Sequence, residues 1–167
     1  MATIIQFEDM EIWQQAREIC KDVYALCSKG SFAKDFELVR QISRSSGSCM
    51  DNIAEGFERD GNKEFFQFLS ISKGSIGETR SQLFRALDRG HISQTEFDVL
   101  VPKCLKASKD IGNFMRYLRN SDMKGSKSFE ALSESGIRNQ ESANAEDRKP
   151  PRQHRRQGDP ERTKPRS

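Results

Sequence analysis

Apolar residues recur every three or four positions through four successive segments of this sequence, and only short turn signals separate the segments. This spacing places the apolar side chains on one face of an α-helix. Helices are therefore expected at about residues 9–28, 35–58, 62–90 and 93–120. No segment before residue 120 has the alternating pattern of a β-strand. Because short connections make consecutive helices antiparallel neighbours, the sequence predicts an all-α, antiparallel up-and-down four-helix bundle.

Turn and capping residues mark the ends of these helices. Lys29-Gly30-Ser31 and Asp60-Gly61 supply the first two stops. Asn62 is expected to cap the third helix, and Ser93-Gln-Thr-Glu96 forms a capping box that opens the fourth. Pro102 should kink or divide the fourth helix, because proline removes a backbone donor and clashes with the preceding turn.

The chain of 167 residues is long enough for one domain with a core, followed by a tail. The bundle domain is expected to span residues 1–120. Residues 139–167 contain no Val, Ile, Leu, Met, Phe, Tyr or Trp, and they hold four of the five prolines. Such a segment buries too little apolar surface to offset the entropy lost on ordering, so residues 121–167 are predicted to form a disordered, polar and basic tail.

The sequence shows no feature of a membrane or secreted protein. No apolar run approaches the roughly 20 residues that cross a bilayer. The first residues lack the basic region and long apolar region of a signal peptide. We therefore expect a cytoplasmic protein that does not enter a membrane.

The four cysteines, Cys20, Cys27, Cys49 and Cys104, each lie inside a helical pattern and show no C-x-x-C spacing. This arrangement favours reduced, small core residues over disulfides or zinc ligands. The sequence predicts no metal site and no cofactor.

The predicted second helix carries a polar stripe beside its apolar stripe of Leu38, Ile42, Cys49 and Ile53. At 100° per residue, the polar residues fall within a sector of about 80°. They are Gln41, Arg44, Ser48, Asn52, Glu55 and Arg59. The stripe is either a solvated face with local pairs or a contact surface for something polar.

Small residues interrupt the two central helices. Gly47 and Gly56 each cost about 1 kcal/mol of helix propensity relative to Ala, a cost usually accepted where another backbone approaches closely. Residues 70–77 are also rich in Ser and Gly. We interpret them as a close helix contact, because a P-loop would need a preceding strand and a Gly-Lys-Ser/Thr ending.

Groups for catalysis are sparse. His91 lies at a turn and His154 in the tail, and no hydrolase, zinc-protease or P-loop motif occurs. Glu55 and Asn52 have the chemistry of an acid–base pair, but a structural polar contact between helices is the favoured interpretation. We predict that the protein is not an enzyme.

Nucleic-acid binding is indicated by where the charge lies. The first 120 residues carry 17 Lys and Arg against 17 Asp and Glu, whereas residues 148–167 carry eight basic residues against two acids. The candidate nucleic-acid-binding residues lie on the second and third predicted helices: Arg40, Arg44, Arg59, Lys63, Lys73, Arg80, Arg85 and Arg89. An oligomer that gathers these cations would form a phosphate-binding field, with the tail adding contacts without sequence preference. The other interpretation is a solvated charged face.

Several motifs resemble one family. They are the opening Phe7-Glu-Asp-Met-Glu-Ile-Trp13-Gln-Gln-Ala16, the segment Asn52-Ile-Ala-Glu-Gly56, Gln41, Arg44 and Ser48 before it, and Arg59, Phe65, Phe68-Leu69, Gly74-Ser75 and Glu78 after it. Over about residues 7–119, the chain resembles the four helix bundle protein family. That family includes proteins encoded in intervening sequences of bacterial large-subunit ribosomal RNA genes. It is related to the accessory variability protein of diversity-generating retroelements.

The resemblance implies a subunit of a ring-like homopentamer, which in the retroelement relatives resembles a basic platform that binds nucleic acid and holds a reverse transcriptase. It makes Gln41, Ser48, Asn52, Glu55 and Gly56 structural or oligomer signature positions. Arg44 and Arg59 become candidates for interface pairing or phosphate contact. Three positions depart from the family pattern: Ser43 replaces a second basic residue, Cys49 an aliphatic residue and Arg80 an acid.

Two functional hypotheses follow. The first is a non-enzymatic homo-oligomer that binds RNA or DNA and serves a reverse transcriptase as accessory subunit. The second is a structural scaffold that binds only protein and uses its polar stripe in subunit contacts. An enzyme that uses Glu55 is the least favoured alternative.

Overall fold

The computed structural model describes residues 4–59 and 61–123, and over these residues it contains helices and no strand. Four α-helices follow one another: α1 (Glu11–Cys27), α2 (Phe36–Glu58), α3 (Asn62–Asp88) and α4 (Gln94–Met123). The short 3-10 helices η1 (Phe7–Asp9) and η2 (Phe32–Lys34) precede α1 and α2. α4 runs past its predicted end near residue 120, and the rest of the predicted tail lies outside the described residues.

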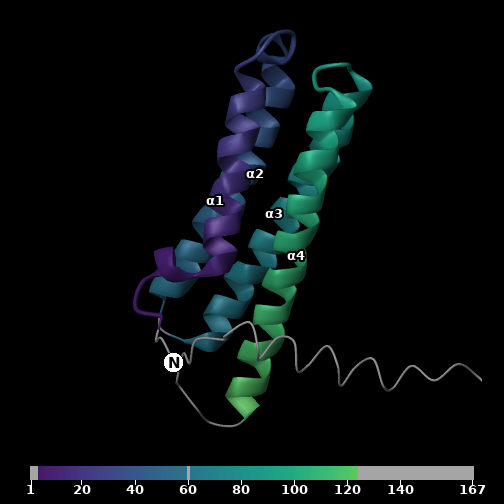
Figure 1. The fold of residues 1–167 in the computed structure, drawn as a ribbon. Helices are drawn as coiled ribbons and strands as arrows, with labels where there is room; N and C mark the ends of the chain where they lie inside the picture. Colours follow the sequence, from purple (N-terminus) through teal and green to yellow (C-terminus); the bar gives the residue numbers. More distant parts are fainter. Residues whose placement is uncertain (1–3, 60, 124–167) are drawn as a thin grey trace, which may run out of the picture. The chain divides into compact units, whose positions relative to one another are not determined.

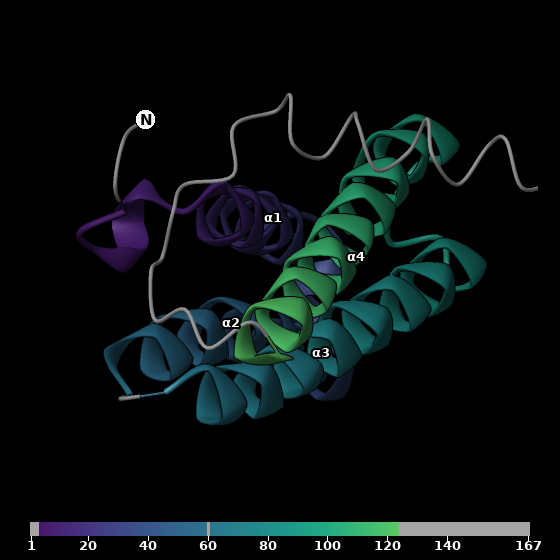
Figure 2. The ribbon, with the colours of Figure 1, turned by 90° about the horizontal axis from the view of Figure 1, so that it is seen from below.

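Successive helices alternate in direction, which confirms the up-and-down bundle (Figure 1). Each helix packs against the next along the chain, and α4 also packs against α1. Seen from below, α1 and α4 lie on one side of the bundle, and α2 and α3 lie side by side on the other (Figure 2). The most extensive packing joins α2 to α3. No helix among the described residues is long and apolar enough to span a bilayer.

The predicted apolar stripe of α2 forms the centre of the core. Leu38, Ile42, Cys49 and Ile53 have no exposed surface. Each buried aliphatic side chain contributes roughly 1.5–3 kcal/mol to folding. They are covered by buried residues of the other helices, among them Ile19, Val23, Leu69, Ile76, Leu83, Cys104, Ala107, Ile111 and Leu118.

All four cysteines are free thiols, and Cys27, Cys49 and Cys104 are buried. Burial raises the pKa of Cys27 and Cys49 to about 11 and that of Cys104 to about 12. These three thiols therefore stay protonated at neutral pH and behave as core residues.

α2 has a side-chain cap that was not predicted, and the predicted capping box of α4 is confirmed. The Asp35 carboxylate caps α2 by accepting a bond from the Leu38 N–H at 3.2 Å. The capping box of α4 forms in both directions, with Ser93 N–H donating to Glu96 at 2.8 Å and Glu96 N–H to the Ser93 hydroxyl at 3.2 Å.

Two predictions about helix ends and interruptions need correction. Asn62 is not the cap of α3: it is the first helical residue, and Gly61 occupies the cap position with φ 129°. Only glycine readily adopts that conformation. Of the two outcomes predicted for Pro102, division of α4 is wrong, because the helix is continuous through that residue, and a kink stays a prediction. The carbonyl that loses its donor belongs to the exposed residue Asp98, where water can satisfy it.

Close packing at glycine occurs at Gly56 but not at the other predicted positions. A Cβ at Gly56 would lie 2.6 Å from Phe68 Cβ and 2.7 Å from Phe65 Cδ2. The same addition at Gly47, Gly74 or Gly77 would meet nothing within 4 Å. In the segment 70–77 it is instead the serines that make the helix contact, since Ser72 and Ser75 are buried.

Candidate nucleic-acid interface

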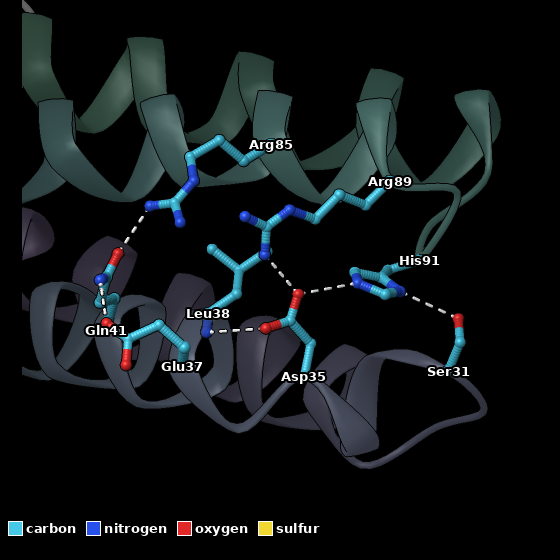
Figure 3. Close-up of polar contacts among 8 residues, drawn as sticks. All are labelled: Ser31, Asp35, Glu37, Leu38, Gln41, Arg85, Arg89 and His91. Atoms are coloured by element: carbon cyan, nitrogen blue, oxygen red, sulfur yellow. Dashed lines mark hydrogen bonds and ion pairs between the residues drawn. The ribbon is translucent and has the colours of Figure 1, made fainter.

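The polar stripe of α2 lies along the seam with α3, and Gln41 and Ser48 form hydrogen bonds across that seam. Gln41 donates to Glu37 and accepts a bond from Arg85 of α3, both at 2.6 Å (Figure 3). The Ser48 hydroxyl lies 3.0 Å from that of Ser75. Asn52 donates to the Ser48 carbonyl at 2.7 Å. These contacts favour a structural use of the stripe.

Glu55 does not form an acid–base pair with Asn52. Its carboxylate accepts a bond from Arg59 at 2.9 Å, whereas Asn52 bonds to Ser48. Both side chains bond within α2, so their described contacts include neither the acid–base pair nor the favoured polar contact between helices.

Beneath the stripe, a buried polar cluster joins α2 to α3. The Ser45 hydroxyl lies 2.8 Å from that of Thr79 and 2.6 Å from Gln82 Oε1. All three side chains are buried. Because buried polar groups must find partners, this cluster fixes the pairing of the two helices.

Above this cluster, a hollow of about 360 Å³ opens on the seam. It is lined by Gln41, Arg44, Ser45, Ser48 and Glu78. The charged residues Arg44 and Glu78 are of opposite sign, so the hollow has no excess charge that would attract phosphate.

Four of the eight predicted nucleic-acid-binding residues are engaged within the bundle. Arg40 pairs with Glu37 at 3.0 Å, and Arg89 pairs with Asp35. Arg59 pairs with Glu55 at 2.9 Å and lies over the ring of Phe68. Arg85 donates to Gln41, as described above. Three of these four cations are thus neutralised locally, which weakens their case as phosphate ligands.

The other four, Arg44, Lys63, Lys73 and Arg80, form no ion pair or hydrogen bond with any described residue. Lys63, Lys73 and Arg80 fall within about 100° of one another around α3, so they share one flank of that helix. We call these three residues the basic row. It extends over about 26 Å at 1.5 Å per residue. Lys73 and Arg80 lie near α4. Lys73 is beside Gly112, and the charge of Arg80 acts on the Cys104 thiol.

A second hollow, of about 390 Å³, lies between α3 and α4 on this flank. Its charged lining residues are Lys73, Lys109, Arg116 and Arg119, all of them basic. The remaining lining residues are Phe66, Ser108, Gly112, Asn113 and Met115. We call this the basic hollow. Cations without an acid among them raise the local positive potential, which attracts phosphate.

The predicted nucleic-acid-binding residues did not include Lys109, Arg116 and Arg119. Their spacing of seven and three positions places them on one face of α4, which was a usable signal. The sequence could not show that this face meets Lys73 rather than the acids of α1, since that depends on how the helices pack.

On the opposite flank of α4, two other lysines pair with acids. Lys103 pairs with Asp22 of α1 at 2.6 Å. Lys106 pairs with Glu11 at 2.8 Å and with Asp110 at 2.9 Å. The bond to Glu11 is the main cause of the raised pKa of Lys106. α4 therefore has a neutralised flank toward α1 and a positive flank toward α3.

A polar cluster at one end of the bundle ties the α1–α2 turn to the α3–α4 turn (Figure 3). The Asp35 carboxylate, besides capping α2, lies 3.0 Å from His91 Nε2 and accepts a bond from Arg89. His91 Nδ1 lies 2.9 Å from the Ser31 hydroxyl, and its ring stacks on Phe32. Ser, His and Asp also compose nucleophilic triads, but Asp35 is already committed to the helix cap and to Arg89. We interpret the cluster as a structural link.

No group of three or more His, Cys, Asp or Glu residues within the described ranges is placed to hold a metal ion.

The sequence profile of a family described as 23S rRNA-intervening sequence protein matches residues 8–113. Among solved structures, a protein of unknown function from the S23 ribosomal protein family of Bacteroides thetaiotaomicron VPI-5482 has a similar fold, with a TM-score of 0.57 and 19% identity. The similarity covers 62% of this chain and 97% of that chain. At this identity, the likeness concerns the fold alone. No curated protein matches the sequence.

Proposed function

This chain belongs to the 23S rRNA-intervening sequence protein family, and from that premise we propose that it is a non-enzymatic homo-oligomer that binds RNA. The observation that carries the proposal is the basic hollow with the basic row beside it. The charged residues that line the hollow are all basic, although the first 120 residues have equal numbers of basic and acidic residues. Segregation of this kind is typical of phosphate-binding surfaces.

Under this proposal, the predicted site residues have different roles. Lys63, Lys73 and Arg80 become the main phosphate contacts from α3, and α4 adds cations through the basic hollow. Arg44 stays a secondary candidate because Glu78 lines the same hollow. The paired residues Arg40, Arg59 and Arg89 become structural, since phosphate would have to displace their carboxylate partners.

Oligomerisation, with five copies as the resemblance implies, would multiply this surface. Several weak patches that engage one RNA gain affinity through effective concentration. The resemblance also supports two finer proposals, that the protein acts in the cytoplasm and that a reverse transcriptase is a partner. DNA remains the second nucleic-acid ligand to test.

A scaffold that binds only protein is the competing proposal. It is favoured by apolar side chains that are more exposed than a core would leave them, notably Tyr24 at 73% and Phe36 at 78%. It also accounts for Gly74 and Gly77, whose open surroundings leave room for another helix. Under this proposal, the three cations of the basic row are simply solvated.

The test is binding of the full-length protein to a labelled fragment of 23S ribosomal RNA and to duplex DNA across a range of salt. The variant Lys63→Gln/Lys73→Gln/Arg80→Gln should bind RNA more weakly and lower the salt slope by about 2–3, since each phosphate contact contributes about 0.7–0.9. The matched control, Arg40→Gln/Lys103→Gln/Lys106→Gln, removes the same charge from cations that already have acid partners. Equal losses in the two triple variants, or no RNA binding by the parent protein at low salt, would contradict the proposal.

A further inference from the structure

We propose that the basic hollow binds an unpaired nucleotide of an RNA strand, with its phosphate on the cations and its base against Phe66. This inference rests on the proposed RNA-binding function and names the form of RNA that the surface takes.

The charges around the basic hollow favour a phosphate ligand. Lys73 projects from α3, and Lys109, Arg116 and Arg119 follow one face of α4, so cations border the hollow from both helices. Arg116 donates to Asn113 Oδ1 one turn earlier on α4, which holds its guanidinium at the hollow. A guanidinium fixed in this way can still offer its remaining donors to phosphate oxygens.

The basic hollow also has the size of a ligand site. A volume of about 390 Å³ falls within the range of ligand pockets, roughly 300–1,000 Å³. Gly112 helps to form this space, because a Cβ there would lie 3.3 Å from Lys73 Nζ. The absent side chain lets the Lys73 ammonium lie against α4. A larger residue at this position would displace Lys73 and fill part of the hollow.

Part of the lining of the basic hollow is apolar. Phe66 and Met115 are half-buried, so part of each side chain remains accessible within the hollow. A site for inorganic phosphate alone has no use for an aromatic side chain. A base can stack on it, and such stacking tolerates any base because every base has a π face.

The cations, the size and the aromatic lining of the hollow together favour an unpaired strand over a duplex. An A-form RNA helix presents phosphates and 2′-hydroxyls, while its stacked bases are out of reach of a ring in a hollow. A single strand offers the phosphate and the base together. Lys63 and Arg80 lie on the same flank of α3 before Phe66 and beyond Lys73, where they can contact neighbouring phosphates.

The experiment compares the affinity of the full-length protein for a labelled single-stranded oligouridine and for an RNA duplex of equal charge. Phe66→Leu keeps an apolar side chain but removes the ring, and it should weaken single-strand binding about fivefold or more while duplex binding changes little. Gly112→Leu fills the hollow without changing charge; it should weaken single-strand binding by more than duplex binding, which is affected only by the displacement of Lys73. Lys73→Gln should weaken binding to both RNAs and lower both salt slopes by about 1.

Lys106→Gln is the matched control, since Lys106 lies on α4 but pairs with Glu11 and Asp110. It should leave both affinities near those of the parent protein. If Phe66→Leu and Gly112→Leu bind the single strand like the parent while Lys73→Gln binds weakly, the nucleotide inference is overturned and the proposed function stands. If the parent protein binds neither RNA, the proposed function itself fails. Circular dichroism of each variant establishes that it is folded.

Discussion

At the scale of single residues, Gly56 shows most directly how a side chain can be excluded by packing. Gly56→Ala should destabilise the protein by roughly 1–3 kcal/mol, because the new Cβ must displace Phe65 and the Cβ of Phe68. Gly47→Ala is the control: it lies in the same helix with nothing within 4 Å, so it should stabilise by roughly 0.5–1 kcal/mol. Urea unfolding of both variants measures the difference. Opposite signs are expected, and equal effects would mean that the close approach of α3 to Gly56 is absent.

Asp35 gives a pH dependence at the same scale. The bond from Arg89, followed by that from the Leu38 N–H, lowers the pKa of Asp35 to about 2. The unfolded chain binds this proton with a pKa near 3.9, so the carboxylate stabilises the fold fully above about pH 4. That contribution is lost as pH falls from about 4 to about 2.

The variant Asp35→Asn tests this dependence, because Asn still caps a helix but carries no charge. The variant should be less stable than the parent at pH 7, and the gap should narrow steadily as the pH is lowered through that window. Asp51→Asn, which removes an exposed acid from the same helix, is the control. A gap between parent and Asp35→Asn that stays constant from pH 7 to pH 2 would show that the charge of Asp35 contributes nothing.

At the scale of elements, the contact between α2 and α3 depends on hydroxyl and amide groups that sequence patterns treat as polar surface. Ser45→Ala should cost roughly 1–3 kcal/mol, because it leaves the buried Gln82 Oε1 without the Ser45 donor. Adding Gln82→Leu removes that acceptor, so the double variant should regain much of the loss. Thermal unfolding of the two single variants and the double variant measures the coupling. Simple additivity would show that the two groups do not depend on each other.

The contact between α2 and α3 also shows which features of this protein could be predicted from its sequence. Periodicity was sufficient for four helices and for the α2 core, because Leu38, Ile42, Cys49 and Ile53 repeat at helical spacing. It was insufficient for the cations, because a pattern shows which face of a helix a charge lies on but not what that face meets. The pattern therefore predicts Arg89 as a phosphate ligand, whereas the structure pairs it with Asp35. The pattern does not predict Arg116 as a phosphate ligand, whereas the structure places it in the lining of the same hollow as Lys73.

At the scale of the whole molecule, the net positive charge lies in the predicted tail and not in the bundle. The first 120 residues have no net charge, whereas residues 148–167 carry eight basic and two acidic residues, a net charge of +6. Any preference among RNA forms must then come from the bundle, since the tail, which the sequence predicts to be disordered, would contact phosphates without discrimination. Five copies of the 19.1 kDa chain, about 96 kDa, would concentrate both contributions on one RNA.

Replacing the eight basic residues of 148–167 by Gln in the full-length protein separates the two contributions. The altered protein should keep the mass of about 96 kDa in light scattering, because assembly is proposed to lie in the bundle, five times 19.1 kDa. It should bind RNA more weakly, with a smaller salt slope, yet still distinguish an unpaired strand from a duplex. A monomeric mass for the parent protein would remove the multivalent part of the argument. Loss of all binding in the tail variant would mean that the bundle only gathers the tails, and that the basic hollow takes no part in recognition.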